Sequence, residues 1–417
     1  MNIHRFGGAL HATAWVLLAM IMFTGCVKNE PKHNNLPVST YLKRLHSERE
    51  RTVEQAIEDI VAIGGEATPF LVEAWQKAED DTEYRCRIAK AIHGIGPDAS
   101  AAVPVLVEAL DALDEQLIAC TAEALAGIGS ASAPAAEKLA MLLRVSDTST
   151  QSFILQALGG IGDPAAEPAL DRVKEAALRP RTRAEAIEAL GNMGPKSITA
   201  MEEWIKSGDE EKQVIACEAM AYAGDDVVPA LPTLAEAMQY KNDRIRVAAI
   251  RAVAQAGPEA IRITDKLISA LRYKDKETRD AAVNALAAIG QEIGPQLSNH
   301  LTDRNANVRE GVVRVISRYG NLRDEYREQL IARLGDYNGE VRVAAINALT
   351  QAGETIVPRM RQLLNSKDVF IQFGAARIIG DIGGPEARKA IPKLRELQQH
   401  EDSLVRKGAE EALRNLQ

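Results

Sequence analysis

The chain has 417 residues, of which 46% are hydrophobic but only 4% aromatic, and its formal net charge is −8. Globular enzymes usually fill wide cores with aromatic side chains, which bury about 150–250 Å² each. The apolar content here comes from Ala, Leu, Ile and Val, which suits thin layers of closely packed helices. The acidic balance disfavours nucleic acid as a partner, because affinity for a phosphate backbone comes largely from Lys and Arg.

The beginning of the chain predicts an export signal. A weakly positive start is followed by an uncharged apolar run of 12 residues, Ala12–Phe23. This run is shorter than the roughly 20 residues that span a bilayer, and it fits the apolar region of a signal peptide. The next residues, Phe23-Thr24-Gly25-Cys26, resemble the lipobox of bacterial lipoproteins, in which the Cys receives a lipid and becomes the mature N-terminus.

The lipobox resemblance implies a signal peptide over residues 1–25 and lipidation of Cys26. An ordinary secretory peptide with an incidental Cys, or an uncleaved N-terminal anchor, is the alternative. Since Val27 rather than Asp follows the Cys, the resemblance implies delivery to the periplasmic side of the outer membrane if the cell is Gram-negative. Residues 26–40 are interpreted as the lipidated Cys and a flexible tether, because the stretch to Pro37 is polar and aperiodic.

Residues 41–417 repeat one pattern. A glycine that ends a helical stretch recurs every 30 to 33 residues, always with an apolar residue four positions earlier and usually with Ala five positions earlier. These glycines are Gly64, Gly96, Gly129, Gly162, Gly194, Gly224, Gly257, Gly290, Gly320, Gly353 and Gly383. In the unit Asp336–Leu364, one apolar helical face ends at Gly353 and a second follows, with Pro358 near its start.

Neither helix of such a unit can bury its apolar face alone, so neighbouring units must stack. The small Ala side chains let neighbouring helices approach closely. The sequence therefore predicts an all-α fold, an α-α superhelix of about eleven full helical repeats and a truncated C-terminal one.

The repeat resembles a known family. Its pattern is a turn, then V-R-x-x-A-x-x-A-L-x-x-I-G, then x-x-P-x-L-x-x-L. This resembles the short, phycobilisome-lyase-like HEAT repeat, which implies a helical solenoid. In that family the Arg often bonds an Asp six residues earlier, making a ladder along the stack. Here Asp303–Arg309 and Asp336–Arg342 keep that spacing.

An Arg eleven residues before the glycine recurs through the repeats. It is found at Arg85, Arg183, Arg246, Arg279, Arg309 and Arg342, with Arg406 in the truncated unit. Two interpretations stay open. Each Arg pairs with a turn carboxylate such as Asp243, Asp275 or Asp303, or Arg246, Arg279, Arg309 and Arg342 form a ligand-facing basic stripe.

Motifs of catalysis are scarce. The two G-x-G-x-x-A strings, Gly94–Ala99 and Gly160–Ala165, follow helices rather than strands, so they are repeat caps and not dinucleotide sites. The histidines are scattered without metal-ligand spacing, and we expect neither a metal nor a cofactor. The odd number of internal cysteines, Cys86, Cys120 and Cys217, predicts free buried thiols rather than a disulfide framework.

The sequence thus favours a membrane-tethered, protein-binding scaffold of the bacterial cell envelope that is not an enzyme. The family resemblance offers an alternative, a lyase-type enzyme or an enzyme accessory. A third possibility is a spacer without a discrete ligand. Trp75 and Trp204 either anchor a partner or cover the edges of their own repeats.

Overall fold

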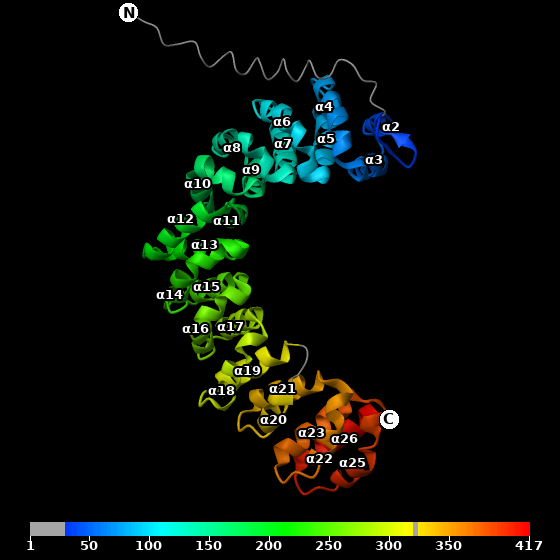
Figure 1. Cartoon of the computed structure of the whole chain (residues 1–417), viewed down its shortest axis with the longest axis vertical. Coiled ribbons are helices and arrows are strands. Elements are labelled where there is room, and N and C mark those ends of the chain that lie inside the picture. Colours follow the sequence, from blue (N-terminus) through cyan, green and yellow to red (C-terminus); the bar gives the residue numbers. More distant parts are fainter. Residues whose placement is uncertain (1–29, 320–323) are drawn as a thin grey trace, which may run out of the picture. The chain divides into compact units, whose positions relative to one another are not determined.

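The computed structural model describes residues 30–319 and 324–417. These residues form successive pairs of α-helices, and their one sheet is a two-stranded antiparallel hairpin (Figure 1). The chain divides into two units, Met1–Ser132 and Ala133–Gln417. The all-α repeat fold that the glycine period predicts is confirmed.

The described part of the first unit contains the hairpin, α2, two helix pairs and the first helix of a third pair. Its elements are β1 (Lys32–His33), β2 (Leu36–Pro37), α2 (Val38–Arg44), α3 (Glu50–Ile63), α4 (Thr68–Lys77), α5 (Thr82–Ile95), α6 (Val103–Ala109) and α7 (Glu115–Ile128). The first helices of consecutive pairs, α3, α5 and α7, pack against one another in chain order.

Part of the segment that the sequence assigns to a flexible tether is folded. The two strands pair Lys32 with Pro37, and α2 begins directly after them. The Tyr41 hydroxyl donates to the His33 carbonyl oxygen at 2.5 Å, and the imidazole of His33 lies 3.6 Å from the buried carboxylate of Asp59 on α3. Residues 32–40 thus belong to the folded body, together with the repeats that follow.

The second unit continues the same alternation. Its helices are α8 (Ala136–Leu142), α9 (Thr148–Ile161), α10 (Asp163–Ala177), α11 (Arg183–Asn192), α12 (Gly194–Lys206), α13 (Glu210–Met220), α14 (Leu231–Ala237), α15 (Asp243–Gln255), α16 (Thr264–Ala270), α17 (Lys276–Ile289), α18 (Gly294–Asn299), α19 (Ala306–Ser317), α20 (Asp324–Arg333), α21 (Gly339–Thr350), α22 (Val357–Leu363), α23 (Val369–Ile382), α24 (Gly384–Arg388), α25 (Ile391–Leu397) and α26 (Ser403–Leu416). Its first helices, from α9 through α11, α13, α15, α17, α19, α21 and α23 to α26, stack in order.

Each repeat has the same local signals at its two ends. A side-chain oxygen of Asp or Asn caps most first helices by accepting a backbone N–H of the first turn. These caps are Asp81, Asp114, Asp147, Asp209, Asn242, Asp275, Asn305, Asn338, Asp368 and Asp402. At the other end Gly96 has φ +75°, a backbone conformation that L side chains rarely adopt, so α5 must end there. The second helix then usually begins with a short 3₁₀ turn.

Small residues allow the first helices to approach closely. The Ala column is buried, with Ala252, Ala285 and Ala348 at most 2% exposed. A Cβ added to Gly380 on α23 would lie 2.6 Å from the Cα of Ala412 on α26. A larger side chain there would separate the helices and lose their dispersion contacts. Close approach therefore also requires a small residue at this position, two residues after the Ala column.

One helical run among the described residues, Glu115–Leu142, is long and apolar enough to cross a membrane. It comprises α7 and α8 joined by the 3₁₀ turn Gly129–Ala135. Since α7 packs against α5 as the first helix of a repeat, its apolar residues serve the repeat core.

Candidate binding groove

The recurring arginines lie in the first turns of the first helices, where they close the preceding turn. Arg246, Arg279, Arg309 and Arg342 each donate from Nη1 to the backbone carbonyl oxygen six residues earlier, at 2.7–3.1 Å. Arg406 does the same to the His400 carbonyl at 2.7 Å. Each guanidinium therefore satisfies a carbonyl that the end of the preceding helix leaves unpaired.

Two buried arginines of this column also bridge to the next repeat, as the more exposed Arg183 does to Glu211. Arg309 donates from Nε and Nη2 to the two carboxylate oxygens of Asp336, at 2.8 and 2.7 Å. Arg246 makes a single such bond, from Nη2 to the Asp275 carboxylate at 3.0 Å. Arg246 and Arg309 are only 5% and 2% exposed. A charge-assisted guanidinium–carboxylate bond is among the strongest hydrogen bonds in proteins, so these pairs fix one repeat on the next.

The carboxylate of Asp336 is held in its ionised form. Burial alone would raise the pKa of Asp336, but hydrogen bonds from the Arg309 side chain and from the Asn338 backbone amide outweigh burial, and the pKa lies below its usual range. The pair with Arg309 is therefore charged at neutral pH.

The ladder runs between repeats rather than within one. The family resemblance implies pairs of Arg309 with Asp303 and of Arg342 with Asp336. In the structure each Arg takes the backbone carbonyl of that Asp, while the Asp336 carboxylate binds Arg309 of the preceding repeat. The carboxylate of Asp303 likewise binds Arg272, at 2.7 Å.

A basic stripe through all four arginines is not formed at the surface. Arg246 and Arg309 are buried, and the guanidinium of Arg342 lies over the ring of Phe370, 4.0 Å from its centroid. Of the four, Arg279 is the one that lines a groove.

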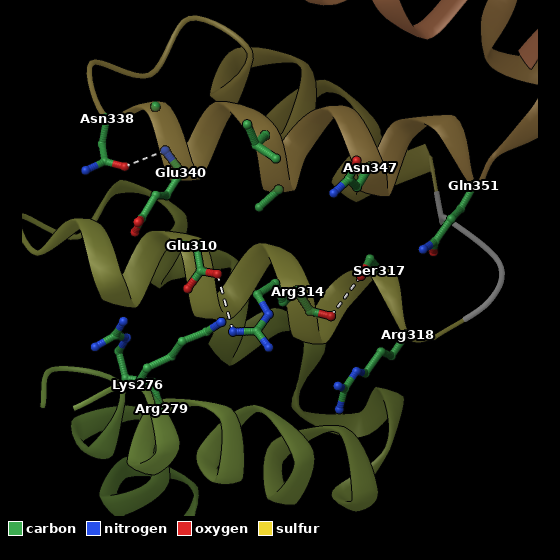
Figure 2. Close-up of a pocket in the computed structure, with 13 residues that line it drawn as sticks. Lys276, Arg279, Glu310, Arg314, Ser317, Arg318, Asn338, Glu340, Asn347 and Gln351 are labelled. Carbon is green, nitrogen blue, oxygen red and sulfur yellow. Dashed lines mark hydrogen bonds and ion pairs between the residues drawn. The ribbon is translucent and has the colours of Figure 1, made fainter. Parts of the chain in front are cut away.

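That groove crosses the first helices of three consecutive repeats, α17, α19 and α21, and encloses about 970 Å³ (Figure 2). Its lining residues are Lys276, Arg279, Glu310, Arg314, Ser317, Arg318, Asn338, Gly339, Glu340, Val343, Ala344, Asn347 and Gln351. Figure 2 shows Lys276 and Arg279 on α17, below the Glu310 and Arg314 side chains of α19. Three stacked helices thus form one continuous floor.

The middle of the groove holds a charge network. Arg314 lies 2.7 Å from the Asp280 carboxylate on α17 and 3.3 Å from Glu310 one turn earlier on its own helix. Burial raises the pKa of Glu310, although the nearby charges of Arg314 and Arg279 act in the opposite direction. Arg318 donates to the side-chain oxygen of Asn284 at 2.5 Å. The network links α17 to α19 and leaves other polar groups available to a ligand.

The sequence did not lead us to these groove residues, although some of them share one position in the repeat. Asn284, Arg314 and Asn347 each stand six residues before a repeat glycine, next to the buried Ala column. They are polar where the neighbouring positions are apolar. A search for polar residues at this register would have found the face of the first helices.

The prediction of three free thiols is wrong for two of them. Cys86 on α5 and Cys120 on α7 form a disulfide, with Cα atoms 5.3 Å apart. They are 34 residues apart, about one repeat, so stacking places them at adjacent positions on neighbouring first helices. Counting cysteines could not find this pair, but comparing their spacing with the repeat period could have.

The third cysteine fits the prediction. Cys217 is free and fully buried on α13, and burial raises the pKa of its thiol to about 12. Trp75 is also buried, with Arg85 over its ring at 5.6 Å, so it covers its own repeat. Cys26 and the export signal lie outside the described residues.

No group of three or more His, Cys, Asp or Glu side chains that could hold a metal ion occurs within residues 30–319 and 324–417. The side chains of the groove instead offer cations, carboxylates and amides, which suit recognition of a polar ligand.

A family model described as HEAT repeats matches residues 327–414, which include α21 of the groove. No curated protein sequence matches the chain. Among solved structures, an engineered protein is similar at 22% identity and a TM-score of 0.28, covering 91% of this chain and 98% of that one. The karyopherin Kap121p bound to Nup53p is similar at 14% identity and a TM-score of 0.44, covering 91% and 51%.

The E. coli protein YibA is similar at 19% identity and a TM-score of 0.35, covering 58% of this chain and 92% of that one. The chain spans about half the length of the karyopherin. With TM-scores this low, the fold assignment rests on the helix pairs themselves and on the family match to residues 327–414.

Proposed function

We propose that this protein is a non-catalytic scaffold that binds a segment of another protein in the groove on α17, α19 and α21. A lipid on Cys26 holds the scaffold at a bacterial membrane, in the cell envelope. The observation that carries the proposal is the groove itself, a hollow of about 970 Å³ that is lined by charged, amide and apolar groups and is continuous over three repeats.

The geometry of the groove supports an extended protein ligand. Helices packed at 8–10 Å spacing make a floor about 16–20 Å long across three repeats, which an extended chain of about five or six residues would cover at 3.3 Å per residue. The floor carries amides at Asn347 and Gln351 that can both donate and accept, as peptide groups do.

The disulfide supports export. Disulfides form and persist in secreted and periplasmic proteins and are rare in the cytosol. Because Cys86–Cys120 joins two repeats in the folded core of the first unit, it suits a chain that folds outside the cytosol. The lipobox resemblance at Cys26 gives the same compartment independently.

A groove-filling variant tests the binding site. Val343 is 57% exposed on α21 within the groove, and Val343→Trp fills it without changing its charge. Ile261→Trp is the matched control, since Ile261 is 47% exposed and does not line the groove. After crosslinking in native envelopes and affinity purification, we expect a specific partner with wild type and Ile261→Trp, and its loss with Val343→Trp. Equal recovery with both variants would place the site elsewhere.

A second experiment tests the tether. Cys26→Ser removes the lipid acceptor, so the protein should lose its diacylglycerol mass and leave the membrane fraction after signal cleavage. Mass spectrometry of the N-terminal peptide and fractionation of envelopes measure both. An unmodified Cys26 in the membrane-bound wild type would contradict the lipid anchor. No feature of the described residues favours the lyase-type alternative.

A further inference from the structure

We infer that the segment bound in this groove is acidic, with carboxylates that pair with Lys276, Arg279 and Arg318. The inference rests on the proposed function and adds the chemical class of the ligand. It follows from which charged groups of the groove have partners inside the protein and which have none.

Three cations of the groove lack a carboxylate within the described residues. Lys276 makes no ion pair there, Arg279 bonds only the carbonyls of Tyr273 and Lys274, and Arg318 bonds only the amide oxygen of Asn284. Their three positive charges face the groove in a protein whose net charge is −8.

The carboxylates of the groove compensate only part of this charge. Glu310 already pairs with Arg314, which also pairs with Asp280. Glu340 makes no ion pair within the described residues. Three cations without an ion pair therefore stand against one such carboxylate. When Arg314 and its two carboxylates are included, four cations stand against three carboxylates, so the groove keeps a net positive charge.

Arg279 differs from two arginines at the same position in other repeats, because it has no carboxylate partner among the described residues. Its counterparts Arg246 and Arg309 each bind a carboxylate of the next repeat, Asp275 and Asp336. Asp275 stands fifteen residues before its repeat glycine and Asp336 seventeen. In the repeat after Arg279 these two positions hold Asn305, which has no carboxylate, and Asp303. The carboxylate of Asp303 is held by Arg272 instead, at 2.7 and 3.3 Å.

Within the part of the chain that the structure describes, the ladder of inter-repeat pairs therefore lacks a rung at Arg279, as it also does at Arg342. Arg342 lies over the ring of Phe370, whereas Arg279 lines the groove. The guanidinium of Arg279 keeps donors free beyond its two carbonyl bonds. A carboxylate from a bound ligand would supply the missing rung in the geometry that a guanidinium prefers.

The rest of the lining favours a peptide over an anionic lipid headgroup. Asn347 and Gln351 offer amide groups at the end of the groove near Arg318, as Figure 2 shows. Val343, half-exposed between the charged groups, suits an apolar side chain. A protein segment presents carboxylates, amide groups and apolar side chains at regular spacing, whereas a headgroup presents charge alone.

The raised pKa of Glu310 agrees with an acidic ligand. Burial disfavours the charge of Glu310, so this carboxyl group takes up a proton more readily than an exposed one when a second carboxylate arrives beside it. Mild acid should therefore strengthen the binding of an acidic segment, as long as the ligand itself stays ionised.

The test uses the full-length lipidated protein in neutral nanodiscs and a fluorescent eight-residue peptide of alternating glutamate and alanine with one central leucine. Fluorescence anisotropy measures its affinity beside two matched peptides, in which glutamine or lysine replaces every glutamate. We expect the glutamate peptide to bind at least about tenfold more tightly than the glutamine peptide, and the lysine peptide to bind least. Raising the salt concentration should reduce the difference.

Substitutions that change one charge of the groove test whether the peptide binds there. Lys276→Glu and Arg318→Glu should each weaken the glutamate peptide by about tenfold, while Glu340→Gln should tighten it by about two- to threefold. Arg279 is left unchanged because it also closes the turn at Tyr273 and Lys274. Lys266→Glu on α16 is the control, since Lys266 is exposed and does not line the groove; its affinity should equal that of wild type.

Three outcomes would overturn the inference. If the glutamine or lysine peptide binds as tightly as the glutamate peptide and Val343→Trp abolishes that binding, the groove binds peptides without preferring acidic ones, and the proposed function survives alone. If peptide binding is lost in phosphatidylglycerol nanodiscs but kept in phosphatidylcholine nanodiscs, the cations bind lipid headgroups. Affinities that do not change in any of the charge variants would contradict the inference equally.

Discussion

The two units hold neighbouring repeats together with different bonds. In the first unit a disulfide joins Cys86 on α5 to Cys120 on α7. In the second unit a buried ion pair joins Arg309 on α19 to Asp336, just before α21. Both bonds fix one first helix on the next. The disulfide depends on redox conditions and not on pH, whereas the ion pair depends on pH and not on redox conditions, so the two units can be destabilised separately.

Breaking the ion pair should have the largest effect. Asp336→Ala leaves the Arg309 guanidinium buried without its carboxylate, and we expect the free energy of unfolding of the second unit to fall by about 3–5 kcal/mol. Denaturant titration followed by circular dichroism measures the change. Glu277→Ala is the matched control, because Glu277 forms an exposed inter-repeat pair with Arg251 and should lower stability by about 0–1 kcal/mol. If both variants lose the same free energy of unfolding, burial of the Arg309–Asp336 pair does not increase its contribution to stability.

Removing the disulfide should have the next largest effect. The bond closes a loop of 34 residues, so Cys86→Ala with Cys120→Ala should destabilise the first unit by about 2–4 kcal/mol. Reductant should produce the same loss in wild type and none in the double variant. Thermal denaturation with and without reductant tests this, and a wild type that does not respond to reductant would exclude the disulfide.

Acid should weaken the ion pair of the second unit without breaking the disulfide of the first, and its effect should be smaller than that of either substitution. Since the folded-state pKa of Asp336 lies below its usual value, the native state binds fewer protons than the unfolded state. Its stabilisation is complete above the unfolded pKa of about 3.9 and is lost as pH falls through the folded pKa. Stability measured from pH 7 to pH 3 should fall less steeply in Asp336→Asn than in wild type. The same slope in both proteins would contradict the charged pair.

The smallest expected effect is on the alkylation of Cys217, which reports when the second unit opens. Because burial raises the pKa of the Cys217 thiol to about 12, almost no thiolate exists at pH 8, and the native protein should resist alkylation. Cys217 should become labelled only when denaturant opens α13, as mass spectrometry of the modified peptide would show. Removing the disulfide of the first unit should leave this labelling unchanged. Rapid labelling of the native protein would mean that the second unit opens readily.

Much of the repeat could be predicted because its signals are local. The glycine period, the Ala column and the apolar faces all lie within one repeat, and each follows from helix geometry. A further local signal went unused. An Asp or Asn stands fifteen residues before most of the repeat glycines, as Asp81 does before Gly96 and Asn338 before Gly353, and these residues cap the first helices.

The candidate groove could not be predicted in the same way. Arg246 and Arg279 occupy the same register in their repeats, yet one is buried against Asp275 of the next repeat and the other lines the groove. In the repeat after Arg279 the position of Asp275 is taken by Asn305, and Asp303 two residues earlier is held by Arg272, so Arg279 has no carboxylate among the residues that the structure describes. No pattern within a single repeat contains that information.

The sequence by itself determined that this protein is a stack of helix pairs, because each pair carries its own caps, its glycine stop and an apolar face that it cannot bury alone. Only the tertiary structure decided how one repeat is joined to the next. It paired Cys86 with Cys120 and Arg309 with Asp336, and it gathered side chains of α17, α19 and α21 into one groove. The physical reason is that contacts within a helix follow its fixed period, whereas contacts between repeats depend on how closely and at what rotation the helices pack.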